Sequence, residues 1–410
     1  MSIILNKERL LLVILGIILY IYIYNPPFVF LPFTPIKLLY PIAFFYLCKK
    51  RLFSKLITCY KVEFLFFICI IFYSFFRGLF TNELGYSKTN LITLIETLFL
   101  SYCFVIYFKT NIIRKQFIDF FINIAGLAAI ISVILIFFPS INQYIRDVLL
   151  KRTEYTDMLK LRNFGFSEGL SYAYGIVQGI AFSFCLIYSK KKINLWLMPF
   201  FFISILFNAR IGFVPIIIVL CYLLFTGKGY NILIRFTLIF LLITFILYNV
   251  PIFEDFTKTI EWGFAFFTQI LDFTLQNNDG NTETFDILFK AMLVLPQSIS
   301  EYIWGSGHDI FLVSDKNTDM GYLLQLNFGG IIYCLFLYCF VWYMFLRLYF
   351  INKEIRSFSY FFLFVIIIVN IKGYILFTSP AYRVLFIFYI YYTIDHPIRK
   401  NMTDARNAIT

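Results

Sequence analysis

Residues 305–330 form a polar loop that runs into an apolar segment, GSGHDIFLVSDKNTDMGYLLQLNFGG. The loop holds His308, one of the two histidines in the chain, and the carboxylates of Asp309, Asp315 and Asp319. An imidazole or a carboxylate can take the proton of a hydroxyl group that attacks an electrophile. Asp319 is therefore the first candidate for a general base, and His308 is the second.

Each candidate also has an ordinary structural interpretation. Asp319 lies where the N-cap of the following helix would fall, so capping explains this residue as well as catalysis does. A loop histidine is more often merely solvated. Trp304 and Tyr322 could stack on a ring of a bound ligand, although aromatic side chains at this level commonly anchor a protein at the membrane surface.

Arginines are the second candidate group, because a planar guanidinium binds two phosphate oxygens at once. We assign Arg210 first, then Arg162, Arg383 and Arg77, to a pyrophosphate group. Arg210 lies in the polar break FNARIGF between two apolar runs. Irregular backbone at membrane depth is tolerated only where it lines a cavity or is buried in protein. The alternative for each arginine is snorkelling to lipid phosphates or pairing with a loop carboxylate.

The composition places these residues in a membrane protein. Of 410 residues, 61% are hydrophobic and 14% are charged, and the mean hydropathy is +0.82. Soluble domains carry roughly 25% charged residues. The net charge of +12 is dispersed between apolar runs, so it indicates membrane orientation and not nucleic-acid binding. The eight cysteines include no CxxC pair and lie outside the long polar loops, which argues against disulfides and a zinc site.

Apolar runs predict an all-α integral membrane protein with about twelve spans, each of about 20 residues or somewhat fewer. The predicted spans are 10–24, 28–48, 62–80, 91–108, 117–138, 170–188, 194–209, 211–227, 235–250, 320–347, 357–376 and 380–394. The first run lacks a small-residue cleavage site, so we expect it to be retained as a span.

Basic clusters occur at every second junction between spans, as the positive-inside rule requires. They begin at Lys7, Lys49, Lys109, Lys190, Lys228, Lys353 and Arg399. Both termini are then cytoplasmic, and two long loops, 139–169 and 251–319, lie on the outer face. Residues 253–273 carry apolar residues at helical spacing, which suits a helix along the interface. We predict one membrane domain, 1–410, with these loops as an outer cap.

The chain resembles the superfamily of O-antigen polymerases (Wzy) and O-antigen ligases, polytopic membrane glycosyltransferases. The matching features are Ala209-Arg210-x-Gly212-Phe213 between two spans and the long loop that follows. After the loop come Gly305-x-Gly307, Asp319-x-Gly321-Tyr322-Leu323 and Phe328-Gly329. The ligases typically carry a histidine where this chain has Asp319, so the resemblance is closer to the polymerases.

The resemblance implies a glycosyltransferase C-type-like bundle in the bacterial cytoplasmic membrane. It implies transfer of a glycan from undecaprenyl pyrophosphate to a lipid-linked acceptor repeat unit at the periplasmic face, without a metal or other cofactor. The product would be O-antigen of lipopolysaccharide, capsule or another surface polysaccharide. The implied partners are these lipid-linked oligosaccharides and the bilayer, and a chain-length regulator stays open.

Two other functions remain. A flippase for lipid-linked oligosaccharides has a similar length and span number, but it would carry ionisable groups deep within its spans and short outer loops. The spans of this chain are nearly free of charge, which favours the enzyme. An O-antigen ligase differs only in its acceptor, and the sequence separates it weakly from a polymerase.

Overall fold

The computed structural model describes residues 2–112, 117–150, 163–168, 171–188, 192–227, 234, 237, 292–308, 318–376 and 379–395. These residues form helices, and the only β-structure among them is an isolated bridge between Phe28 and Leu150. Four helical stretches are long and apolar enough to cross a membrane: Lys61–Thr81, Gly85–Asn111, Phe117–Phe137 and Gly321–Ile351. The predicted all-α class and the membrane character therefore agree with the described part of the chain.

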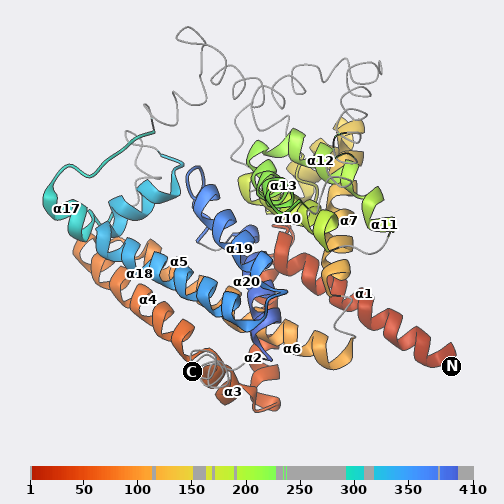
Figure 1. The fold of residues 1–410 in the computed structure, drawn as a ribbon, viewed down its shortest axis with the longest axis horizontal. Helices are drawn as coiled ribbons and strands as arrows, with labels where there is room; N and C mark the ends of the chain where they lie inside the picture. Colours follow the sequence, from red (N-terminus) through yellow and green to blue (C-terminus); the bar gives the residue numbers. More distant parts are fainter. Residues whose placement is uncertain are drawn as a thin grey trace, which may run out of the picture. The chain divides into compact units, whose positions relative to one another are not determined.

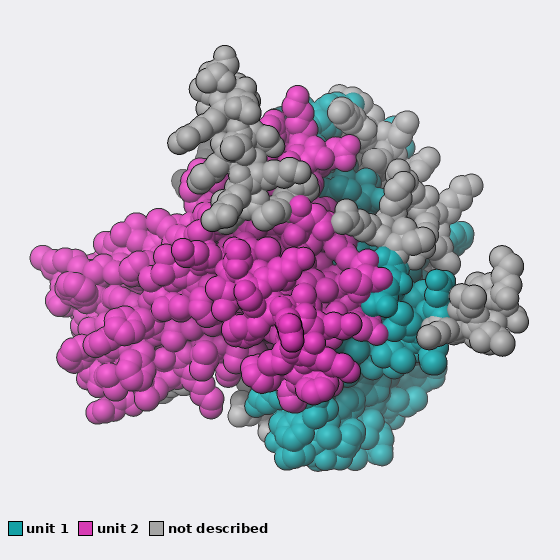
Figure 2. All heavy atoms as spheres, turned by 90° about the horizontal axis from the view of Figure 1, so that it is seen from below, with its two compact units in different colours: residues 1–38, 111–282 teal, residues 39–110, 283–410 magenta. Residues whose placement is uncertain are grey.

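The chain folds into two compact units, which Figure 2 shows in different colours. Unit 1 comprises residues 1–38 and 111–282, and unit 2 comprises residues 39–110 and 283–410. Each unit therefore combines segments that are far apart in the sequence. All eight cysteines in the two units are free thiols.

Unit 1 is built around α10 (Ser171–Ile187). The side chains of residues 173–186 are all buried, as in a helix that is apolar on every side and surrounded by others. Helix α10 contacts α7, α12, η4 and α13. The described elements of this unit are α1 (Ser2–Tyr24), α7 (Phe117–Phe137), α8 (Pro139–Tyr144), η3 (Ile145–Leu149), α10, α11 (Lys192–Trp196), α12 (Met198–Asn208), η4 (Arg210–Gly212) and α13 (Phe213–Thr226).

Unit 2 has α20 (Pro380–Thr393) as its buried helix, with residues 380–390 all buried. Helix α20 packs on η1 and α18, and α18 packs along α4, α17 and α19. Figure 1 shows α4 and α18 running side by side, and α5 also packs on α4. The elements that lie wholly or mostly in this unit are α2 (Ile36–Lys49), α3 (Leu52–Cys59), α4 (Lys61–Thr81), α5 (Gly85–Leu94), η1 (Ile95–Leu100), α6 (Ser101–Asn111), α17 (Ile299–Trp304), α18 (Gly321–Ile351), α19 (Arg356–Val369) and α20.

Several predicted boundaries differ from the structure. The span 28–48 begins its helix only at Ile36, because Pro35 and Pro32 fix the backbone and disfavour a helix before them. The span 357–376 ends its helix at Val369, where the Asn370 side chain accepts a hydrogen bond from the Ile375 backbone N–H. The first predicted loop begins with α8 and η3. Residues 235–250 and 253–273 lie outside the described part, apart from residue 237.

Candidate functional site: a sealed break in helix α18

Helix α18 is broken at Gly330, whose backbone has φ 64° and ψ −167°. A break of this kind removes helical hydrogen bonds from the carbonyl groups just before it. Three of these carbonyl oxygens accept other donors. Asn327 accepts from the Ser306 backbone N–H at 2.6 Å, and Phe328 accepts from the Gly307 N–H at 2.9 Å. The Tyr73 hydroxyl lies 2.8 Å from the Gly329 oxygen. The turn 305–307 and α4 therefore seal the break.

Only glycine fits at this contact. Gly307 has φ 80°, in the left-handed region. A β-carbon on Gly305 would lie 2.2 Å from the Phe328 carbonyl oxygen, and one on Gly330 would lie 2.3 Å from the Ile303 oxygen. The structure thus brings together two of the short motifs on which the family resemblance depends, Gly305-x-Gly307 and Phe328-Gly329.

Arg77 and His308 both lie beside the turn 305–307. Arg77, in the last turns of α4, donates through Nη2 to the Gly305 carbonyl oxygen, while its buried Nε has no hydrogen-bond partner. The His308 Nδ1 lies 2.9 Å from the Glu83 carboxylate, and both side chains are about half exposed. Trp304 ends α17, and its side chain is 50% exposed. Two predicted site residues are therefore brought close together: Arg77 bonds the backbone of the turn 305–307, and His308 directly follows this turn.

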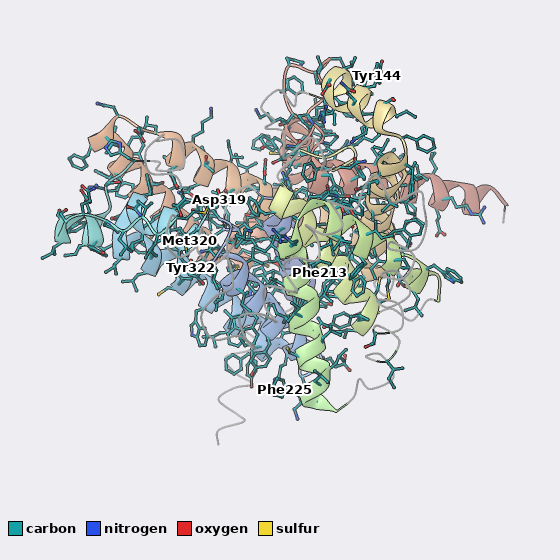
Figure 3. The ribbon with its side chains drawn as sticks, turned by 90° about the horizontal axis from the view of Figure 1, so that it is seen from above. Tyr144, Phe213, Phe225, Asp319, Met320 and Tyr322 are labelled. Atoms are coloured by element: carbon teal, nitrogen blue, oxygen red, sulfur yellow. The ribbon has the colours of Figure 1, made fainter. Side chains whose placement is uncertain are left out.

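Asp319 is exposed at the entry of α18, beside Met320 and Tyr322 (Figure 3). The helix begins at Gly321 and its N-cap is Met320, so the alternative interpretation of Asp319 as the N-cap is wrong by one residue. The Thr318 hydroxyl accepts the Met320 backbone N–H at 3.2 Å. The Tyr322 side chain is held within the protein, since its hydroxyl donates to the Ile367 carbonyl oxygen at 2.8 Å.

A buried amide cluster, missed in the sequence, fastens the start of α18 to the end of α19. The Tyr338 hydroxyl donates to the Gln325 side-chain oxygen at 2.6 Å, and Asn370 donates through Nδ2 to the Tyr338 oxygen. The Asn370 carbonyl oxygen also accepts the Tyr322 N–H at 3.3 Å, one of the first-turn donors that a helix leaves unpaired. Polar residues in an apolar run, such as Gln325, were the available signal.

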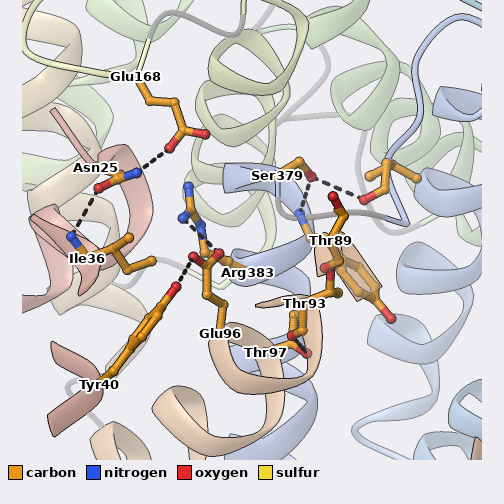
Figure 4. A network of polar contacts seen from close by, with 12 residues as sticks. Asn25, Ile36, Tyr40, Thr89, Thr93, Glu96, Thr97, Glu168, Ser379 and Arg383 are labelled. Carbon is orange, nitrogen blue, oxygen red and sulfur yellow. Dashed lines mark hydrogen bonds and ion pairs between the residues drawn. The ribbon is translucent and has the colours of Figure 1, made fainter. Parts of the chain in front are cut away.

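Arg383 is buried, with 1% of its side chain exposed, and lies 3.2 Å from the Glu96 carboxylate. The second carboxylate oxygen accepts a hydrogen bond from the Tyr40 hydroxyl at 2.7 Å (Figure 4). Glu96 lies in η1, a π-helical turn, and such turns are frequent at functional sites. The sequence singled out Arg383 but not its pairing with Glu96, which spans 287 residues.

A second buried pair joins Arg347 of α18 to Glu63 of α4. Tyr389 donates to the same carboxylate, and the Arg347 guanidinium lies over the Tyr60 ring at 4.7 Å. Burial raises the pKa of the Tyr60 phenol, so this side chain stays protonated. Neither Glu63 nor Arg347 was a sequence candidate, because both lie close to the ends of their apolar runs.

Arg210 belongs to unit 1, in the short 3-10 turn between α12 and α13. Ala209 before it is extended, so the predicted polar break is real, and Arg210 is half-buried there. Arg162 lies outside the described residues.

No protein-family model, curated protein or solved structure matches the chain. Among the described residues, no three His, Cys, Asp or Glu side chains gather as a metal site would require.

Proposed function

We propose that the protein polymerises a bacterial surface polysaccharide at the periplasmic face of the cytoplasmic membrane. It transfers a glycan from undecaprenyl pyrophosphate to a lipid-linked acceptor repeat unit. The observation that carries the proposal is the sealed break in α18, where motif glycines pack on each other beside Arg77 and His308. Irregular backbone at membrane depth is tolerated where it lines a cavity or is buried in protein, and here the turn that packs on the break lies beside two polar side chains that could meet a substrate, Arg77 and His308.

The chemistry needs a proton acceptor and a stabiliser of the leaving group. A hydroxyl oxygen of the acceptor sugar forms a bond to the anomeric carbon of the donor, and the bond from that carbon to the pyrophosphate oxygen breaks. Asp319, exposed at the entry of α18, takes the hydroxyl proton, with His308 as the second choice. Arg77, in the same unit as Asp319, stabilises the charge that develops on undecaprenyl pyrophosphate, and Arg210 is the proposed pyrophosphate ligand of unit 1.

The remaining predicted residues differ in how well their surroundings suit binding of the substrate. Arg383 is already balanced by the Glu96 carboxylate within the protein, which makes it a weaker pyrophosphate ligand than Arg77. Arg162 keeps its proposed place beside the pyrophosphate. Trp304 offers an exposed ring for sugar stacking, whereas Tyr322 offers a ring already stacked on Tyr338 at 5.5 Å.

The test is the ladder of chain lengths made by purified protein from lipid-linked repeat units. Asp319→Ala should abolish products longer than the substrate, and Arg210→Lys should also fail, since an ammonium cannot bind two oxygens in one plane. Asp147→Asn removes another exposed loop carboxylate and should leave the ladder intact. A full ladder from Asp319→Ala would refute the assignment of the base.

A flippase remains the second candidate, because the structure places two ion pairs inside apolar helices of unit 2. Intramembrane charges often mark a transport path. The two functions predict different deletion strains. Loss of a polymerase leaves a single repeat on each acceptor, whereas loss of a flippase, or of a ligase, leaves no surface glycan.

A further inference from the structure

Asn208, the last residue of α12, connects three parts of unit 1 through one fully buried amide. Its Oδ1 accepts the Asn163 backbone N–H at 2.7 Å, and its Nδ2 donates to the Ser132 hydroxyl of α7 at 3.1 Å. The Ser132 hydroxyl in turn donates to the Asn163 carbonyl oxygen. Asn163 is thus held at both of its backbone polar groups by side chains of α7 and α12.

The segment 163–168, which we call the strap, is also fastened at its far end. The Glu168 N–H donates to the Tyr24 carbonyl at 2.7 Å, and its carboxylate accepts from Asn25 Nδ2 at 2.7 Å (Figure 4). In the middle, the Tyr20 hydroxyl donates to the Phe166 carbonyl at 2.9 Å. The strap is therefore a fixed surface against which Asn208 can hold the end of α12.

The turn that follows Asn208 is fixed on its other side by glycines. A β-carbon on Gly179 would lie 2.0 Å from the Gly212 carbonyl oxygen, and one on Gly212 would lie 2.4 Å from the Gly175 oxygen. Backbone thus meets backbone between α10 and η4. Arg210 lies between these two attachments, two residues after the amide and two before the glycine.

We propose that Asn208 is the positioning residue for Arg210: its amide locks the end of α12 to the strap, so that the backbone that carries the Arg210 side chain is held in one place for binding of a pyrophosphate group. This inference rests on the proposed function for its ligand. An amide is needed because the residue must accept from Asn163 and donate to Ser132 at the same time. Leucine has a similar volume and can do neither.

Two measurements on the full-length protein in nanodiscs separate positioning from ligand binding. Hydrogen exchange reports how firmly residues 163–168 and 209–213 are held, and titration with inorganic pyrophosphate reports binding. We expect Asn208→Leu to speed exchange in both segments, and to weaken pyrophosphate binding, each by about tenfold or more. Arg210→Ala should weaken binding to a similar extent without faster exchange in 163–168.

The matched control is Asn194→Leu, which removes another fully buried amide of unit 1. Asn194 lies in α11, and its Nδ2 donates to the carboxylate of Asp119 in α7. It should change neither exchange in the two segments nor binding. Ser132→Ala serves if Asn208→Leu does not fold, since it removes only the hydroxyl group of the same cluster. Unchanged exchange in Asn208→Leu, or equal effects from Asn194→Leu, would overturn the positioning role. Faster exchange in Asn208→Leu, together with unaltered pyrophosphate binding by Arg210→Ala, would support positioning but count against the proposed function.

Discussion

Arg347 and Glu63 form a buried pair whose removal has a clear expected result. Glu63 is completely inaccessible, and Arg347 has 7% of its surface exposed. Glu63→Leu leaves the guanidinium without its carboxylate, which should lower the free energy of unfolding by about 3–5 kcal/mol. The double variant Glu63→Leu/Arg347→Met should recover most of this loss, because no uncompensated charge stays buried.

Denaturant unfolding in detergent measures this difference. The control is Asp395→Asn, which breaks the more exposed pair with Lys109 and should cost about 1 kcal/mol or less. If Glu63→Leu were as mild as the control, water would have to reach the pair in the folded protein.

Arg383 poses a separate question at the residue scale, because it has both a proposed ligand role and an internal partner. Its guanidinium faces Glu96, and Glu96 also accepts from Tyr40. We expect the double variant Glu96→Leu/Arg383→Met to fold and to retain polymerase activity, whereas Arg383→Met alone should destabilise the protein by leaving Glu96 unpaired. A double variant that folds but is inactive would contradict this expectation and would support a role of Arg383 in binding pyrophosphate.

At the scale of elements, the break in α18 depends on contacts between backbones. An alanine at Gly330 combines a positive φ with a β-carbon 2.3 Å from the Ile303 carbonyl oxygen. Gly330→Ala should therefore cost about 2–5 kcal/mol in unfolding free energy and detach the turn 305–307 from α18. Thermal unfolding, together with proteolysis between α17 and α18, measures both effects.

Gly85→Ala is the matched control, since a β-carbon there meets nothing within 4 Å. It should be neutral or stabilising by up to about 1 kcal/mol, because alanine favours a helix over glycine. Equal stability of the two variants would mean that the break in α18 is not sealed in the membrane.

At the scale of the whole molecule, the proposed orientation makes a prediction about both faces of the membrane. Single cysteines can be placed in a variant that lacks the eight native thiols. A membrane-impermeant thiol reagent added outside should label cysteines at Asp147 and Glu283, in the two long loops. It should not label cysteines at Lys50 or Lys353, in basic clusters assigned to the cytoplasm. Labelling at Lys353 from outside would refute the count of about twelve spans.

The sequence by itself determined the helical class, because long apolar runs leave a backbone in lipid no other way to pair its polar groups. It also located the polar break at Arg210 and singled out Arg383 as a candidate residue. The apolar runs, however, did not place every helix boundary. Pro32 and Pro35 delay α2 until Ile36, and α18 begins one residue after the position that would make Asp319 its cap.

Only the tertiary structure decided which of these residues meet. Glu96 pairs with Arg383 across 287 residues, and Asn208 reaches Asn163 across 45. The glycine turn 305–307 seals a break that lies about twenty residues further along the chain. Contacts at such separations depend on how whole helices pack, since a residue's type states which bonds it can form but not which partner the fold will bring to it.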